Sequence, residues 1–344
     1  MAYTTINKST DYFNTVLYTG NSSTLNVTGV GHQPDFVWIK DRSSSGDDYA
    51  MYDAVRGVNK RIRSNQNDAE NTETAALTSF DSDGFTVGTA GSSNGNGDSF
   101  VAWNWKANGQ GSSNTDGSIN TTYTSVNTTA GFSISQYTGT GATATIGHGL
   151  GVVPKMIIIK QTNTTRNWVV GHDSIGWTKY LYLDSTNAQG TGNLFNDTAP
   201  TNQVFSVVND GGVNASGGTY IAYCFAEKTG YSKMGSFIGN GNADGTFAYL
   251  GFRPAFILVR ASNLTTNWHL YDNKRDPINP ADTILRANSS NVDATNSEFA
   301  YDFVSNGFKA RSSSSEFNGS GNTFIYYAVG QSLVGSNNVP CTAR

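Results

Sequence analysis

The sequence predicts an all-β protein made of three tandem, homologous β-sandwich modules. Composition gives the first reason. Charged residues are 14% of the 344 residues, aromatic residues are 12%, and glycine contributes 38 residues, which is typical of packed strands joined by tight turns and unlike a disordered chain. The second reason is a short apolar segment, preceded by a Gly-x-x-Pro turn, that occurs three times. This recurrence indicates one module used three times.

The recurring apolar segment is predicted to be the central strand of each module. It is a short, continuous run rich in β-branched and aromatic residues, as expected for a buried strand. A Lys or Arg ends each copy, six residues after the proline. The three copies are DFVWIK at 35–40, KMIIIK at 155–160 and AFILVR at 255–260.

Other features recur around this strand. A second strand ends in an aromatic residue or His and then an aspartate, and each module closes with an Asn/Gly/Ser turn and a strong terminal strand, where glycine supplies a positive φ. The aspartates are Asp53, Asp173 and Asp272, which lie 19, 19 and 18 residues after the prolines, and the closing turns begin at Asn94, Asn214 and Asn318.

The repeats define the expected domain boundaries. A stretch rich in Gly, Ser, Asn and Thr separates the first two modules and is interpreted as a linker. Regular strands without a helical period indicate sandwiches of the jelly-roll or lectin-like kind. The predicted parts are a leader (1–11), three modules (12–108, 131–230 and 231–330), the linker (109–130) and a C-terminal docking tail (331–344).

Charge and hydropathy exclude several classes of partner. The net charge is −4 with Lys and Arg scattered, so we expect no nucleic-acid binding. No apolar run approaches the ~20 residues that cross a bilayer, so we expect no membrane insertion. The N-terminus shows no signal peptide, so we expect synthesis in the cytoplasm without signal-dependent export. Cys224 and Cys341 do not form a disulfide framework.

Catalytic motifs are absent, and we predict no catalytic residue and no enzymatic activity. The sequence contains no nucleophile elbow, phosphate-binding loop, dinucleotide fingerprint or paired-histidine zinc motif. Residues 81–84, Asp-Ser-Asp-Gly, resemble the start of a calcium loop, but the downstream glutamate is missing. We therefore expect no cofactor and keep calcium as an alternative.

Aromatic and acidic residues form a hypothetical carbohydrate site. Trp177 has few apolar neighbours in sequence and is the best candidate for an exposed ring, which could cover the apolar face of a sugar while amides and carboxylates contact hydroxyls. The alternatives are packing for the tryptophans and a backbone-capping role for the recurring aspartates. The hypothetical site residues are Trp177, Asp173, Trp168, Trp268 and Asp272.

Several of these motifs resemble a known family. Tyr137-Thr138-Gly139, the segments 148–156 and 220–227, and Gly251-Phe252-Arg253-Pro254 are similar to a repeated domain of unknown function found in structural proteins of marine bacteriophages, including cyanophages. The resemblance covers residues 12–330. It implies concanavalin-like or jelly-roll sandwiches in a virion protein, and it supplies no active-site motif.

The expected function is that of a non-enzymatic virion protein on the particle surface, similar to a tail fibre or adhesin, that contacts host surface polysaccharide. Capsid or tail proteins are the expected partners, and a homotrimer or higher ring is expected by analogy. The alternatives are a capsid decoration or head-fibre protein, a tail depolymerase with two facing carboxylates, and a free-standing lectin. The tail residues expected to mediate assembly are Leu333, Val334 and Pro340.

Overall fold

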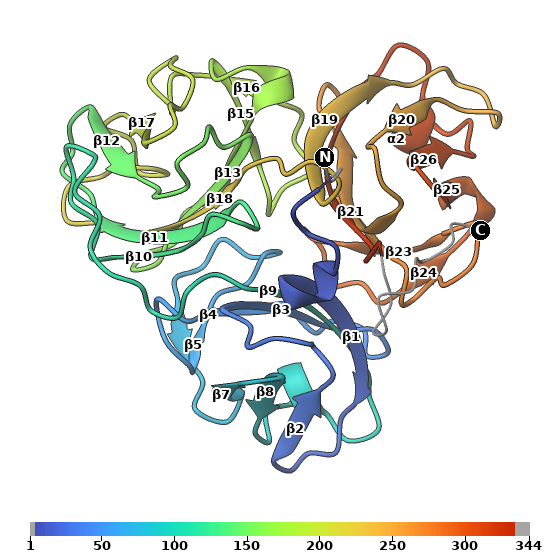
Figure 1. The fold of residues 1–344 in the computed structure, drawn as a ribbon, viewed down its shortest axis with the longest axis horizontal. Coiled ribbons are helices and arrows are strands. Elements are labelled where there is room, and N and C mark those ends of the chain that lie inside the picture. The colour runs from blue at the N-terminus through green and yellow to red at the C-terminus, as the bar shows by residue number, and fades with distance from the viewer. Residues whose placement is uncertain (1–3, 334–344) are drawn as a thin grey trace.

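The computed structural model describes residues 4–333 and is all-β, as predicted. Three large antiparallel sheets surround a common centre, and each has a smaller sheet on its outer side (Figure 1). We call these groups the first, second and third lobes; they follow one another along the chain. The short helices are α1 (Gly91–Asn94), α2 (Ser315–Asn318) and the 3-10 turns η1 (Ser9–Asp11), η2 (Asp173–Ile175) and η3 (Ser297–Phe299).

The large sheets share one strand order. The first contains β1 (Phe13–Thr19), β9 (Ser99–Trp105), β3 (Phe36–Asp41) and β4 (Ala50–Asp53), in this order. The second contains β10 (Tyr123–Asn127), β11 (Phe132–Thr138), β18 (Thr219–Phe225), β13 (Met156–Gln161), β14 (Val169–His172), β15 (Lys179–Tyr182) and β16 (Gly190–Thr191). The third contains β19 (Ser232–Ile238), β27 (Thr323–Gly330), β21 (Pro254–Ala261), β22 (His269–Asp272), β23 (Thr283–Arg286) and β24 (Ala294–Thr295).

The smaller sheets cover the outer face of each large sheet. In the first lobe they are β2 (Leu25–Thr28), β8 (Gly84–Val87) and β7 (Leu77–Asp81). The pair β5 (Lys60–Arg61) and β6 (Asn71–Thr72) instead continues the first large sheet beyond β4, through a bridge between Met51 and Ile62. The second lobe has β12 (Ala144–Gly147) and β17 (Val204–Val207). The third has β20 (Phe247–Tyr249), β26 (Gly307–Ala310) and β25 (Tyr301–Val304).

The central strands β3, β13 and β21 are buried on both faces, which explains their continuous apolar sequence. Successive side chains of a strand point to opposite faces. In β3, Phe36 and Trp38 belong to a cluster shared by all three lobes, whereas Val37 and Ile39 belong to the first lobe's own core. The other two strands divide their side chains in the same way: Met156, Ile158, Phe256 and Leu258 join the shared cluster, and Ile157, Ile159, Ile257 and Val259 do not.

Aromatic contacts join the lobes pairwise and close them into a ring. The ring centroids of Phe36 and Tyr223 are 4.6 Å apart between the first and second lobes. Phe225 and Tyr327 are 4.7 Å apart between the second and third lobes. Phe13 and Phe256 are 5.4 Å apart between the first and third lobes. The first and last strands of the chain are therefore part of one continuous core.

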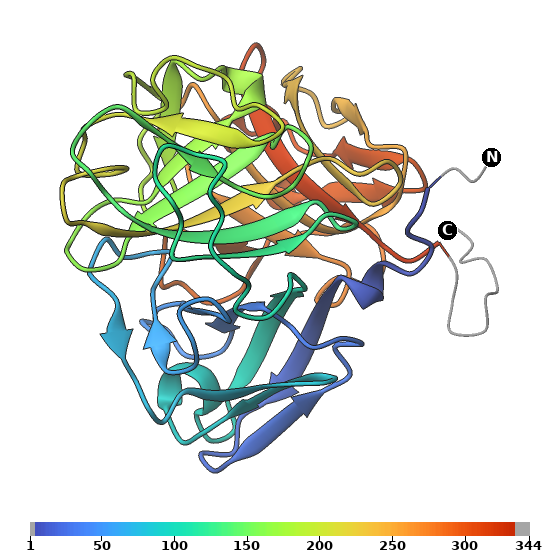
Figure 2. The same cartoon turned by 60° about the vertical axis from the view of Figure 1, so that its left-hand side comes forward.

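The leader contributes to this core. Ile6 is buried in the shared cluster, and the Leu333 amide donates to the Asn7 carbonyl at 2.9 Å. The leader therefore lies beside the end of β27 (Figure 2). Leu333 is half-buried, whereas Val334 and Pro340, also expected to mediate assembly, lie outside the described residues, as does Cys341.

Residues 109–130 differ from the expected linker. β10 pairs with β11 along five residue pairs, and backbone bridges join Ser112 to Thr124 and Ile119 to Ile146. Glycine and polar residues here serve an ordered edge of the second lobe, so composition alone gave the wrong interpretation. The closing turns are as predicted, with positive φ at Gly97, Gly217 and Gly321. In residues 4–333 no helix has the length and hydropathy to cross a bilayer.

The shared core predicts cooperative unfolding. Phe256 is fully buried at the meeting point of the lobes, and Phe→Ala changes in protein cores cost ~3–5 kcal/mol. We expect Phe256→Ala to lower the stability by this amount while thermal unfolding stays a single transition in calorimetry. Phe247→Ala, at a position 43% exposed, is the matched control and should have little effect. Separate transitions for the lobes in the wild-type protein would contradict a shared core.

Candidate functional site

Two of the three recurring aspartates are structurally equivalent, and the third is not. Strand register places Asp53 opposite Phe36 and Asp272 opposite Phe256, but it places His172 opposite Met156. Asp173 is therefore one residue beyond the equivalent position. The similar spacing from the prolines was misleading because the β3–β4 connection is one residue longer than the corresponding connections in the other lobes.

Asp53 and Asp272 are buried structural carboxylates. Asp53 pairs with Arg56 at 2.6 Å and Asp272 with Arg275 at 2.7 Å, in both cases between Oδ2 and Nε. Each also accepts a hydrogen bond from a neighbouring lobe: Tyr223 Oη donates to Asp53 at 2.7 Å, and Trp103 Nε1 donates to Asp272 at 3.1 Å. Asp272, predicted to contact sugar, is therefore unavailable to a ligand and joins the third lobe to the first.

The third interface uses the histidine instead. His172 Nε2 donates to the Tyr326 carbonyl at 3.2 Å, which joins the second lobe to the third. Burial lowers the pKa of His172 to about 4, so the ring is neutral at neutral pH. An uncharged ring in this position needs no arginine partner, and the second lobe has Ile175 where the others have Arg56 and Arg275.

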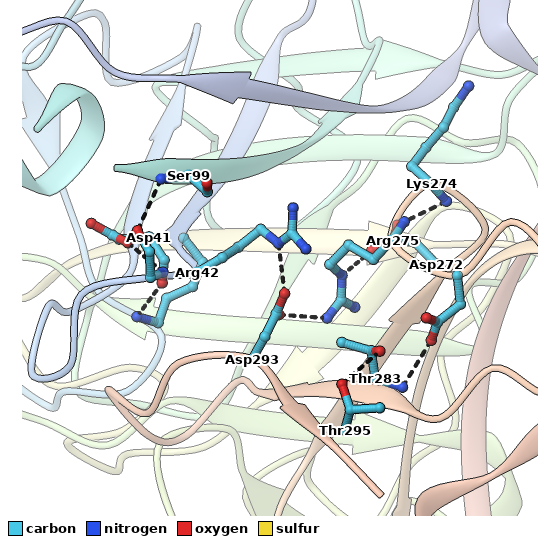
Figure 3. A network of polar contacts seen from close by, with 12 residues as sticks. Asp41, Arg42, Ser99, Asp272, Lys274, Arg275, Thr283, Asp293 and Thr295 are labelled. Atoms are coloured by element: carbon cyan, nitrogen blue, oxygen red, sulfur yellow. Dashed lines mark hydrogen bonds and ion pairs between the residues drawn. The ribbon is translucent and has the colours of Figure 1, made fainter. Parts of the chain in front are cut away.

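An ion-pair chain extends the contact between the first and third lobes (Figure 3). Arg275 Nη1 lies 3.1 Å from Asp293 Oδ1, and Arg42 Nε lies 2.6 Å from Asp293 Oδ2. The chain Asp272–Arg275–Asp293–Arg42 thus alternates in sign across the seam. Because Arg275 is fully buried, the two carboxylates are needed to offset the cost of burying its charge.

The predicted carbohydrate tryptophans are also buried. Trp177 is 6% exposed and packs edge-on against Phe195 at 5.2 Å, so the expectation of an exposed ring was wrong. Trp168 Nε1 donates to the Arg63 carbonyl at 2.9 Å, and Trp268 Nε1 donates to the Tyr182 carbonyl at 2.8 Å. Both tryptophans therefore bind the preceding lobe.

Asp173 is the one member of the predicted set that is exposed. Its carboxylate pairs with Lys155 at 2.9 Å, and it accepts a hydrogen bond of 3.4 Å from Trp177 Nε1. It does not lie beside an exposed aromatic ring. The structure therefore does not assemble the five predicted residues into one surface site.

The calcium-like segment forms a hairpin turn between β7 and β8. Asp81 accepts hydrogen bonds from Ser79 and Thr86, and Asp83 accepts them from the amides of Gly29 and Gly31. In the part of the chain that the structure describes, no three His, Cys, Asp or Glu side chains cluster as metal ligands.

The basic residues that end the central strands have a role that sequence reasoning did not assign. Lys160 is fully buried, and its Nζ donates to the carbonyls of Asn67 at 3.1 Å and Arg166 at 2.8 Å. Burial lowers its pKa to about 8. Arg260 similarly donates to the carbonyls of Thr186 and Asn187 in the second lobe. The recurring Lys or Arg was the available signal. Lys160 and Arg260 bind the preceding lobe, whereas Lys40 donates to the Asp41 and Asp47 carbonyls of its own lobe.

A polar recess of about 430 Å³ opens at the seam between the first and second lobes. Lys160 donates to the carbonyls of two lining residues, Asn67 on one side of the seam and Arg166 on the other. Asn167 accepts a hydrogen bond of 3.4 Å from Asn67 across the seam. The lining residues are Asn67, Thr165, Arg166, Asn167, Val169, Tyr182, Asp210, Gly211 and Gly212.

A second surface feature is an aromatic face on β20. Phe247 is 43% exposed and Tyr249 is 58% exposed, whereas Ala248 between them is buried. The Lys233 ammonium lies 5.3 Å from the Tyr249 ring centroid. The residues at the same register positions are Asn26 and Thr28 on β2, and Thr145 and Gly147 on β12. A comparison of the three copies would have revealed this difference in the sequence.

Buried and exposed aspartates should respond differently to mutation. Asp272→Asn leaves Arg275 without a full counter-charge in the core, and breaking a buried pair costs ~3–5 kcal/mol. Asp173→Asn is the matched control, since exposed pairs contribute ~1 kcal/mol or less. Urea unfolding of both variants measures the difference. Similar losses in the two variants would contradict the structural role of Asp272.

The buried His172 predicts an acid-sensitive stability. Its folded pKa of about 4 lies below the ~6.5 of an exposed histidine, so the unfolded chain binds an extra proton in this window. Stability is therefore full above about pH 6.5 and falls as the pH drops toward 4. We expect His172→Gln to reduce this loss, measured by urea unfolding at pH 7 and pH 4.5. Burial also lowers the pKa of His32 to about 4, so part of the loss remains. An unchanged loss would contradict the assignment.

Comparison with known proteins assigns nearly the whole chain to one family. Residues 8–332 match the family model described as "Domain of unknown function (DUF7483)". The chain has no significant match among curated proteins or among solved structures. The matched span includes all three large sheets. The chain therefore belongs to the DUF7483 family.

Proposed function

We propose that this chain is a non-enzymatic structural protein on the surface of a bacteriophage particle, similar to a tail fibre or adhesin, that contacts host surface glycans. The observation that carries the proposal is the closed ring of three lobes around one apolar core. A body of this kind is rigid and presents its connecting loops outward. The motif resemblance over residues 12–330 supports the virion assignment.

We further propose that the lobes are homologous copies of one jelly-roll or concanavalin-like sandwich. Their large sheets share a strand order. Trp103, Tyr223 and Tyr327 occupy the same register position opposite the central strand. The three interfaces are also of one type, since the end of β4, β14 or β22 contacts another lobe each time. Head-to-tail interfaces that close on themselves are typical of cyclic trimers.

The β20 face supports attachment to another virion protein. Exposed apolar groups that gather on one face mark interaction surfaces, and Phe247 and Tyr249 replace the polar residues or glycine of the other lobes. We propose that this face binds an apolar surface of a capsid or tail protein. The polar recess on the opposite seam remains open to solvent in that arrangement and is available for glycans.

Electron cryomicroscopy of intact particles tests the proposed function. We expect density for this three-lobed body on the particle surface, with the β20 face toward the particle. Density on the tail supports host adhesion, and density on the head shell supports capsid decoration. Absence of the chain from purified particles would contradict the proposal.

A matched pair of variants tests the attachment face. Phe247→Thr with Tyr249→Thr introduces polar side chains like those of the other lobes, and we expect incorporation into particles to fall at least tenfold without loss of folding. Asn26→Ala with Thr28→Ala, on the equivalent strand of the first lobe, is the control. Equal incorporation of both variants would show that β20 is not the contact.

A further inference from the structure

The second and third lobes contain the same single-turn loop, at residues 210–214 and 314–318, but the residues in the loop differ. In the second lobe the Asn214 amide donates to the Asp210 carbonyl at 2.7 Å, and in the third the Asn318 amide donates to the Ser314 carbonyl at 2.9 Å. The strands that follow have the same register opposite β13 and β21. Gly212 therefore occupies the position of Glu316.

In the third lobe, Glu316 fills a carboxylate site built by its own chain. Its Oε1 accepts hydrogen bonds from Thr266 Oγ1 at 3.1 Å and from Asn267 Nδ2 at 2.8 Å, and the Asn267 amide is 3.4 Å away. His269 Nε2 lies 3.1 Å from the same oxygen. These contacts with His269 and Asn267 hold the pKa of Glu316 well below its usual range, so the group is a carboxylate.

In the second lobe two side-chain donors stand at these positions, but the carboxylate is missing and Val169 replaces His269. Arg166 and Asn167 stand at the positions of Thr266 and Asn267, as the shared register of β14 and β22 shows. Within residues 4–333, the Arg166 guanidinium and the Asn167 Nδ2 have no hydrogen-bond or ion-pair partner. Gly212 supplies no side chain to meet them, and the result is the 430 Å³ recess.

The remaining lining residues indicate which chemical groups a ligand needs besides a carboxylate. Asp210 Oδ1 accepts the Gly212 amide at 2.7 Å, which leaves Oδ2 to accept a hydroxyl. Tyr182 is half-buried and provides a ring on one wall, and a ring face packs against the C–H face of a sugar. The lining carries one positive charge, on Arg166, and one carboxylate, on Asp210. The Lys160 ammonium adds a second positive charge next to the lining, where it donates to the Arg166 carbonyl.

We infer that this recess binds a carboxylate-bearing sugar, such as a uronic acid residue of a host surface polysaccharide. Its carboxylate would bind Asn167 and Arg166 as the Glu316 carboxylate binds the equivalent residues of the third lobe. Arginine with a carboxylate forms strong, geometrically specific hydrogen bonds. The inference rests on the proposed contact with host glycans and assigns its site and chemical class.

Calorimetric titration with two matched ligands tests the inference. The first is a hexasaccharide of uronic acid residues, and the second is the same hexasaccharide with its carboxyl groups reduced to hydroxymethyl groups. We expect the wild-type protein to bind the acidic ligand at least tenfold more tightly. Arg166→Thr, which introduces the residue of the third lobe, should abolish this preference. Lys179→Gln, which removes a positive charge from β15 outside the recess, should retain it.

A third variant places a carboxylate in the recess. Gly212→Glu imitates Glu316 and should compete with the ligand, reducing acidic binding at least tenfold. A Cβ at Gly212 would lie 2.9 Å from Val169 Cγ2, so folding is checked by circular dichroism. If this variant does not fold, Arg166→Thr decides alone, because the Arg166 side chain is exposed and unpartnered.

Three outcomes would overturn the inference: no binding of the acidic hexasaccharide by the wild-type protein, equal affinity for both ligands, or unchanged affinity in Arg166→Thr. None of these affects the particle location, which electron cryomicroscopy determines separately. Conversely, absence from particles would contradict the proposed function even if the recess bound uronic acids.

Discussion

The apolar core shared by the three lobes is the constraint on which the rest of the structure depends. Each central strand must be apolar on both faces, because one face packs within its lobe and the other packs against two neighbouring lobes. Burying a polar group in this centre without a hydrogen-bond partner costs free energy. Several buried polar groups avoid this cost with a hydrogen bond to another lobe. They are the carboxylates of Asp53 and Asp272 and the indole N–H groups of Trp168 and Trp268.

Local sequence predicted the features that local physics determines. The continuous apolar runs predicted the central strands, and the Asn/Gly turns predicted positive φ at Gly97, Gly217 and Gly321. The candidate site was not predictable in this way. Trp177 has polar sequence neighbours, and its packing partner Phe195 is supplied by a distant loop. Asp173 was wrongly treated as the equivalent of Asp53 and Asp272, because the spacing from the proline does not reveal a one-residue change in loop length.

Differences among the lobes carry more functional information than their similarities. The similarities hold the ring together. The second lobe has His172 in place of an aspartate, Ile175 in place of an arginine, and Gly212 in place of a glutamate. Each change removes an internal charge that another lobe retains, and the last of them leaves Arg166 and Asn167 facing solvent. A copy that is held in place by its neighbours tolerates such losses, since its own ion pairs are no longer needed for folding.

Closure of the ring between the first and last lobes has a consequence for protein synthesis. The ribosome releases the first lobe long before β27 exists, yet Phe13 and Trp105 pack against Phe256, and Trp105 donates a hydrogen bond to Tyr327 at 3.0 Å. Until the third lobe is complete, the inner faces of the earlier sheets are exposed to water, and exposed apolar sheet surfaces are prone to aggregation. Nascent chains of this protein should therefore depend on chaperones until translation ends.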